Sequence, residues 1–140
     1  MQKKISFIDL GKHPITNNFL NVSNPKNEFF YNLKLIFHSE TKLVSLAKFV
    51  SPKKMFNEKY AHRASASKTM QVAYTKLAKL IKKEYKPKSI LEIGSNDGVF
   101  IKHFKDINNL GVEPCKNLAL IKKKMGIKTY DDFWTYELSK

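Results

Sequence analysis

The chain has 140 residues, 42% hydrophobic and 12% aromatic, which is enough for the core of an ordinary domain and excludes a disordered chain. Its 26 basic and 12 acidic residues give a net charge of +14. Because Arg63 is the only arginine, the lysines, including the run at residues 122–124, favour a solvated surface over a specific nucleic-acid-binding face. No apolar run has the length of a membrane-spanning helix, and the run after Lys4 is too short for a signal peptide, so we expect a cytoplasmic protein without a membrane partner.

The N-terminal third is predicted to form small β structure. A short apolar run at residues 7–10 is closed by Gly11 and Pro14. Two further apolar runs, residues 31–37 and 43–50, are joined by a polar segment and predict a hairpin. Further turns are expected at Asn17, Asn18, Asn21 and residues 23–25, and a helical turn within residues 52–60.

From Ser67 onward the apolar spacing changes to that of a helix, with Ser67 as N-cap and Pro87 beyond the end. The apolar stripe of this predicted helix consists of Met70, Ala73, Tyr74, Leu77, Leu80 and Ile81. The following elements are predicted as a strand at 89–93, a helix at 98–105, a strand at 110–113, a helix at 115–125 stopped by Gly126, and a strand at 127–130. This alternation predicts an α/β fold with a parallel sheet.

The turn after the first of these strands carries the strongest functional signal. Gly94 and Gly98 bracket it, and the spacing acid-x-G-x-N-x-G begins at Glu92. Glu113, at the end of the next strand, has the spacing of a carboxylate that binds ribose hydroxyls. Backbone N–H groups at the start of the helix after Gly98 would favour an anionic group. The alternative is that the turn is only a tight strand-to-helix connection.

The sequence from Leu91 to Gly98, followed by Gly111-Val112-Glu113-Pro114 with Asn117 one turn later, resembles the class I S-adenosylmethionine-dependent methyltransferases that C-methylate nucleotide-linked keto-deoxysugars. The N-terminal segment Asp9-Leu10-Gly11-Lys12-His13-Pro14, with Asn17 and Phe19, resembles the same family. The resemblance implies a zinc-binding-like subdomain at residues 1–66 and part of a Rossmann-like methyltransferase domain at residues 67–140. It also implies cofactor contacts from Glu92, Gly94, Ser95, Asn96, Asp97, Gly98, Glu113 and Pro114.

Two features depart from that family. Its zinc site uses two CxxC pairs, whereas Cys115 is the only cysteine here and His13, His38 and His62 do not complete a tetrahedral site, so we expect zinc to be lost and the subdomain to be degenerate. The part that completes the family's sheet is also missing, so we expect either a truncated protein or a partner chain that supplies further strands.

The family's reaction removes a proton beside a sugar ketone and needs a base and a group that stabilises the enolate. Tyr60 and His62 are the candidate catalytic residues and Arg63 the candidate substrate-binding residue. The favoured alternatives are structural: linker packing for Tyr60 and a solvent or phosphate contact for Arg63. Two other functions stay open: a non-catalytic domain that binds a partner chain completing its fold, and a basic nucleic-acid-binding module.

Overall fold

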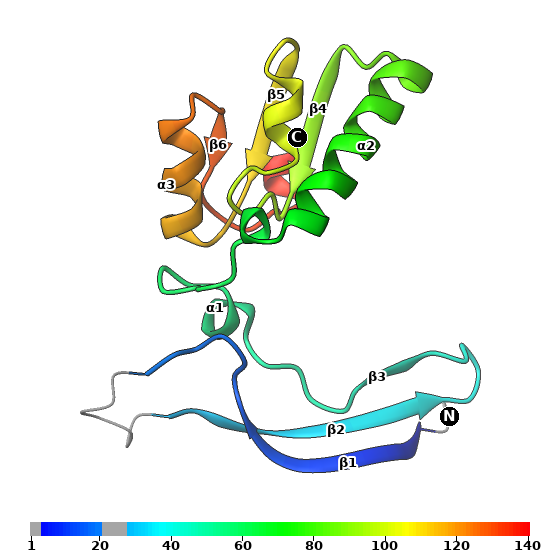
Figure 1. The fold of residues 1–140 in the computed structure, drawn as a ribbon. Helices are drawn as coiled ribbons and strands as arrows, with labels where there is room; N and C mark the ends of the chain where they lie inside the picture. Colours follow the sequence, from blue (N-terminus) through cyan, green and yellow to red (C-terminus); the bar gives the residue numbers. More distant parts are fainter. Residues whose placement is uncertain (1–3, 21–27) are drawn as a thin grey trace. The chain divides into compact units, whose positions relative to one another are not determined.

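The computed structural model describes residues 4–20 and 28–140 and shows a mixed α/β chain with two small sheets (Figure 1). The chain divides into two compact units, Met1–Met55 and Phe56–Lys140. This division comes earlier than the predicted boundary after residue 66, because residues 60–65 hydrogen-bond to the second unit. The turns predicted at residues 21–25 lie outside the described residues.

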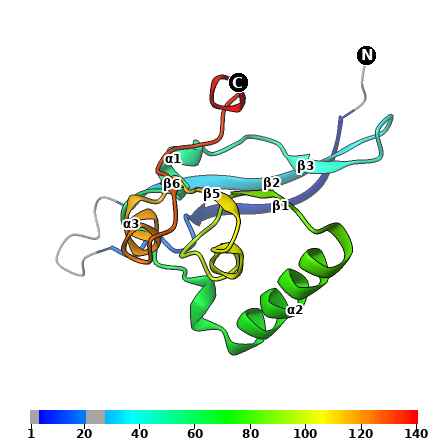
Figure 2. The ribbon, with the colours of Figure 1, turned by 90° about the horizontal axis from the view of Figure 1, so that it is seen from above.

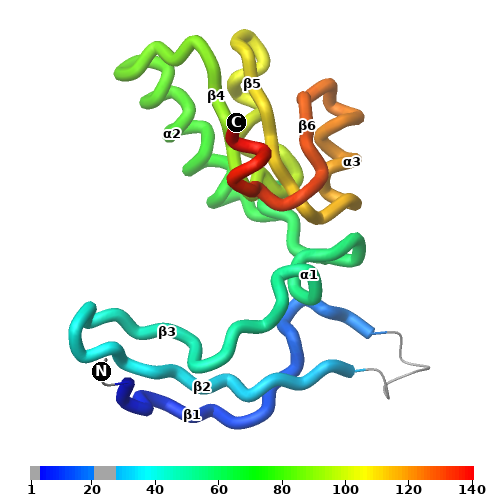
Figure 3. Tube along the Cα trace, turned by 180° about the vertical axis from the view of Figure 1, so that it is seen from behind, coloured from blue at the N-terminus to red at the C-terminus, as the bar shows by residue number. Residues whose placement is uncertain are grey.

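The first unit contains a three-stranded antiparallel sheet in the order β1-β2-β3, coloured blue to cyan in Figure 3. Its strands are β1 Lys4–Pro14, β2 Phe30–His38 and β3 Val44–Leu46, and the helical turn α1 Pro52–Met55 follows. The predicted hairpin is confirmed as β2 and β3, which pair Leu35 with Leu46 and Phe37 with Val44. Ile15, 8% exposed, is the one buried apolar side chain among the described residues of this unit, so the sheet has little core of its own.

Of the two residues predicted to close the first apolar run, Pro14 ends β1, whereas the strand continues through Gly11. The pairing of β1 with β2 is shifted between Asp9 and Lys12, which places Gly11 in a bulge with φ +75°. The Asp9 carboxylate accepts the Gly11 N–H at 3.0 Å, and this hydrogen bond lowers the pKa of Asp9. Glycine therefore bends this strand instead of ending it.

The second unit is built on a three-stranded parallel sheet in the order β4-β5-β6, as the alternation predicts. The strands are β4 Ser89–Ile93, β5 Asn108–Val112 and β6 Thr129–Tyr130. β4 has the predicted bounds, β5 begins two residues before its predicted start at 110, and β6 retains only the last two residues of its predicted range. The register pairs Ile93 with Val112 and Val112 with Tyr130, so the strands end side by side.

The two long helices of this unit confirm their predictions. α2 spans Lys68–Tyr85, its N-cap Ser67 accepts the Met70 N–H, and it ends at Lys86 in the left-handed conformation before Pro87. α3 spans Lys116–Lys124 and is followed by Gly126 with φ +75°. No helix in the described part of the chain is both long and apolar enough to cross a membrane.

The helix predicted at residues 98–105 is wrong, because only the short 3₁₀ segment η3 Ile101–Phe104 forms there. Gly98, with φ +84°, closes a turn by donating its N–H to the Ser95 carbonyl. The Asn109 side-chain amide donates to the Phe104 and Ile107 carbonyls at 3.0 Å each and ends the segment. Such a short segment has no appreciable dipole, so the predicted anion site at a helix N-terminus does not exist.

The core of the second unit lies on one side of its sheet. Seen from above, α2, η3 and α3 lie on one side of the sheet and the C-terminal segment on the other (Figure 2). Short 3₁₀ segments, η2 Ala64–Ala66 and η4 Glu137–Ser139, precede α2 and end the chain. The most buried apolar side chains are Ala78, Val99, Ile101, Phe104, Val112, Cys115, Leu118, Ala119 and Ile127.

Only part of the apolar stripe predicted for α2 is covered. The Tyr74 ring packs on Phe100 with centroids 5.4 Å apart, and Ala78 is buried. Leu77 and Leu80 are exposed, by 43% and 53%. β4 is the edge strand beside α2, so no described strand packs against that flank of the helix (Figure 1).

Replacing Ser67 with alanine removes the side chain that caps α2. We expect Ser67→Ala to lower the free energy of unfolding of the second unit by about 1 kcal/mol, because the Met70 N–H loses its acceptor. Urea unfolding followed by far-UV circular dichroism measures the change. Thr69→Ala, at the exposed second residue of α2, is the matched control, and an equal loss in both variants would contradict the capping role.

Candidate functional site

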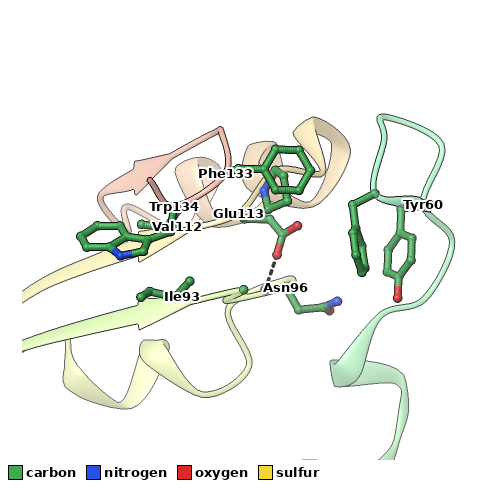
Figure 4. A pocket seen from close by; sticks show the side chains of 10 residues that line it. Tyr60, Ile93, Asn96, Val112, Glu113, Phe133 and Trp134 are labelled. Carbon is green, nitrogen blue, oxygen red and sulfur yellow. Dashed lines mark hydrogen bonds between the residues drawn. The ribbon is translucent and has the colours of Figure 1, made fainter. Parts of the chain in front are cut away.

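A pocket of about 300 Å³ lies where β4 and β5 end (Figure 4). Its walls are mostly apolar, and polar groups come from the turn after β4 and from the residue after β5. The lining residues are Phe56, Tyr60, Ile93, Gly94, Asn96, Val112, Glu113, Pro114, Phe133 and Trp134. The carboxyl ends of parallel strands are where open α/β sheets bind ligands.

Glu113 is the buried carboxylate of this pocket. Its side chain follows β5, is 4% exposed and accepts two backbone N–H groups, from Asn96 at 2.7 Å and from Cys115 at 2.9 Å. These hydrogen bonds tie the turn after β4 to the start of α3. Each oxygen keeps a second lone pair, so the carboxylate can also accept a hydrogen bond from a ligand hydroxyl.

Gly94 leaves the backbone of the pocket uncovered. It has φ +71°, and a Cβ built on it would meet no atom within 4 Å. Its N–H and that of Ser95 both donate to the Val112 carbonyl, at 2.9 and 3.0 Å, so β4 and β5 stay joined to their last residues. A ligand can therefore approach the backbone at Gly94 without a side chain in its way.

The segment at residues 60–65 is fastened to the turn and to α3 by hydrogen bonds. The Asn117 side chain donates to the Tyr60 carbonyl at 2.8 Å, and the Asn96 side chain donates to the His62 carbonyl at 3.2 Å. Asn96 also accepts the Ala64 N–H at 2.9 Å, and Asp97 accepts the Ser65 N–H at 3.2 Å. The rings of Phe56 and Tyr60, 5.5 Å apart, thereby form one wall of the pocket (Figure 4).

Lys122 is fully buried behind the pocket, so the expectation of a solvated lysine run is wrong for this residue. Its ammonium donates to the Ser95 hydroxyl, which in turn donates to the Val112 carbonyl at 3.1 Å. Lys122 shares the inward face of α3 with Leu118 and Ala119, whereas Lys123 and Lys124 point outward. Helical periodicity explains why one member of a run is buried and its neighbours are not.

Burial shifts the pKa values of the groups around Lys122. Burial raises the pKa of Glu92 to about 7, although the positive charge of Lys122 opposes the shift. Burial also lowers the pKa of Lys122 to about 8 and raises that of the Cys115 thiol to about 12. Cys115 is therefore a protonated, unreactive thiol at neutral pH. One oxygen of Glu92 and one of Asp97 are buried without a hydrogen-bond partner among the described residues.

The structure separates the predicted site residues into three groups. Tyr60, Gly94, Asn96, Glu113 and Pro114 line the pocket. Glu92, Ser95, Asp97 and Gly98 lie behind it, where they face Lys122 or the segment at residues 60–65. His62 and Arg63 are exposed and do not line it; the His62 ring lies 6.4 Å from that of Tyr60.

Sequence reasoning missed six residues of the site: Phe56, Ile93, Val112, Phe133 and Trp134, which line the pocket, and Lys122 behind it. Phe133 and Trp134 follow β6, so their place after the last parallel strand was a usable signal. Lys122 had a weaker signal, because it lies four residues after Leu118, on the apolar face of its helix.

The residues of the first unit do not fit a zinc site. His13 donates to the Leu10 carbonyl at 2.9 Å, and His38 hydrogen-bonds the Ser45 hydroxyl at 2.8 Å. Within residues 4–20 and 28–140, no three His, Cys, Asp or Glu side chains gather as metal ligands. A structural zinc ion needs about four such donors.

Comparison with known families gives one match. The family model Methyltransf_13, described as "Putative zinc binding domain", matches residues 1–56. The matched segment ends where the structure divides the chain. The match supports a methyltransferase-associated domain in the first unit and a methyltransferase-related function. No curated protein matches the chain.

The raised pKa of Glu92 predicts a pH-dependent stability. Because its pKa rises from 4.5 unfolded to about 7 folded, the neutral carboxyl contributes stability that is complete below pH 4.5 and lost by about pH 7. We expect Glu92→Gln to gain on the order of 2 kcal/mol relative to wild type between pH 5 and pH 8, allowing for partial exposure. Urea unfolding at both pH values measures the change. Glu58→Gln, at an exposed position, is the control; parallel pH profiles for Glu92→Gln and wild type would refute the burial of Glu92.

Proposed function

We propose that the second unit binds S-adenosylmethionine in the pocket at the ends of β4 and β5, as part of a Rossmann-like methyltransferase. The observation that carries the proposal is the juxtaposition of the uncovered Gly94 backbone with the buried Glu113 carboxylate. The methyltransferase-associated match over residues 1–56 supports the same class of function independently of the pocket.

The chemistry of the pocket suits an adenosine group. Ile93, Val112 and Trp134 offer apolar surface to a flat base (Figure 4). Glu113, held in place by two backbone N–H groups, can accept hydrogen bonds from ribose hydroxyls. A volume of about 300 Å³ is at the lower end of the range for small-molecule sites.

We further propose that the acceptor is a carbon atom of a nucleotide-linked keto-deoxysugar. When bound, the cofactor supplies the methyl group. Tyr60, which lines the pocket, is the candidate to contact the sugar, and the exposed His62 and Arg63 follow it on the same segment. His62 would hold or move a proton and Arg63 would pair with a phosphate of the nucleotide.

Glu113→Gln tests the proposed cofactor site. The amide presents one acceptor and one donor, so it cannot accept both the Asn96 and Cys115 N–H groups and also a ribose hydroxyl. We expect S-adenosylmethionine to bind roughly tenfold or more weakly, since a hydrogen bond to a charged group contributes about 1.5–3 kcal/mol. Isothermal titration calorimetry measures the affinity.

The matched control for this test is Glu137→Gln, an exposed carboxylate in the C-terminal segment. It should leave the affinity unchanged. Equal affinities for wild type and Glu113→Gln, or no binding by the wild-type chain, would contradict the proposed site.

A second candidate function is the binding of a partner chain that completes the sheet. Parallel sheets are normally covered on both faces, yet Leu91 and Ile93 of the edge strand β4 are 45% and 54% exposed. The exposed flank of α2 at Leu77 and Leu80 adds to this apolar surface. No surface of the described residues specifically favours the nucleic-acid alternative, which stays a prediction.

Sedimentation velocity tests the partner-binding surface. Without a partner, we expect the wild-type chain to self-associate as its concentration rises, because exposed apolar strand surface pairs with other copies. Leu91→Gln should shift the chain toward monomer, whereas Leu120→Gln, at a similarly exposed leucine on α3, should not. A well-folded wild-type monomer at all concentrations would argue against this function.

A further inference from the structure

Lys122 is fully buried and links α3 to the turn after β4 by donating to the Ser95 hydroxyl, which in turn donates to the Val112 carbonyl at the end of β5. We propose that Lys122 is a positioning residue: its ammonium group holds Ser95 and offsets the buried charge of Glu113, so that the pocket keeps its binding geometry. This inference rests on the proposed function of the pocket and adds a residue that neither touches the ligand nor belongs to the glycine motif.

Two glycines make room for this lysine. A Cβ on Gly98 would lie 2.7 Å from the Lys122 Cγ, and a Cβ on Gly111 would lie 2.8 Å from the Ser95 hydroxyl and 3.4 Å from the Lys122 Nζ. Gly111 has no positive φ, so its lack of a side chain is explained by space alone. The glycines behind the pocket thus accommodate Lys122, whereas Gly94 is the glycine that is open toward a ligand.

The titratable groups that interact with Lys122 come from several segments around it. They are the carboxyl groups of Glu92 on β4, Asp97 in the turn and Glu113 after β5, and the protonated thiol of Cys115 before α3. Removing the cation would leave buried carboxylates without compensation, which is strongly destabilising for the local structure. A shift of the Glu113 carboxylate would also move the turn that lines the pocket, because Glu113 accepts the Asn96 N–H at 2.7 Å.

Protonation of Lys122 therefore controls the site. Burial lowers its pKa to about 8, so the ammonium is present at neutral pH and lost above about pH 8. Above that pH the carboxylates lose their counter-charge and the turn at residues 94–98 relaxes. Affinity for an adenosine-type ligand should then fall as the pH rises from 7 to 9.

The experiment uses methylthioadenosine, a neutral nucleoside that does not titrate in this range, and the fluorescence of Trp134, the single tryptophan, which lines the pocket. We expect wild type to bind roughly five- to tenfold more weakly at pH 9 than at pH 7. This change corresponds to a difference of at most about one unit between the pKa of Lys122 with ligand bound and without it. Lys122→Met should bind weakly at both pH values, with no step near pH 8. Lys124→Met, at an exposed position on the same helix, should keep the wild-type profile.

Amide hydrogen exchange separates this inference from the proposed function, because it needs no ligand. Lys122→Met should speed exchange at residues 94–98 and 113–115 by tenfold or more relative to residues 74–82 of α2. Uniformly faster exchange would show a merely structural role and overturn the inference. If wild type binds no methylthioadenosine, the proposed cofactor pocket fails, and the exchange pattern still decides whether Lys122 positions the turn.

A second variant covers the case in which Lys122→Met does not fold. Gly111→Ala pushes a methyl group against Ser95 and the Lys122 ammonium without requiring a disallowed backbone conformation. We expect it to weaken binding at pH 7 by roughly tenfold, which corresponds to a loss of about 1.4 kcal/mol in binding free energy. Wild-type affinity that does not change across pH 8, or unchanged binding by Gly111→Ala, would overturn the inference.

Discussion

The second unit depends on a single buried cation. The Lys122 ammonium lies where α3 passes behind the ends of β4 and β5, and it donates to the Ser95 hydroxyl. An ammonium group in a protein interior is costly unless anionic and hydrogen-bonding groups surround it. Carboxylates on β4, in the turn and after β5 supply that compensation, and bare glycines supply the space. The need for nearby carboxylates and for space beside the lysine therefore determines which residues form the rear wall of the pocket.

The polar residues of the turn after β4 have different hydrogen-bonding roles. The side chains of Asn96 and Asp97 are committed to the backbone of residues 62–65, so they fix the linker that carries Tyr60. Gly94 and Glu113 remain as the groups that face the cavity. A glycine-rich motif thus serves three purposes here, which are space for Lys122, attachment of the linker, and access for a ligand. Only the last of these is specific to a cofactor site.

The apolar surfaces of the two units are unevenly covered. The first unit is a single antiparallel layer with Ile15 as its one buried apolar side chain among the described residues. The second has its helices on one side of the sheet. Leu91 and Ile93, which alternate along β4 with the less exposed Ile90 and Glu92, remain exposed. The family match over residues 1–56 and, in the second unit, a parallel sheet with a pocket at its strand ends fit a methyltransferase-related role. The exposed surface of β4 is equally consistent with a partner that adds to the sheet.

The sequence by itself determined the elements whose signals are local. Ser67 and Pro87 bound α2, Gly126 ends α3, and the run from Ser89 to Ile93 forms β4, because capping, left-handed φ and apolar runs act within a few residues. Tertiary structure decided what depends on distant neighbours. Asn109 and Gly98 keep η3 short, and bonds between residues 60–65 and the turn extend the second unit beyond its predicted start. Lys122 is buried because its carboxylate partners come from three other segments, and no local pattern encodes such a cluster.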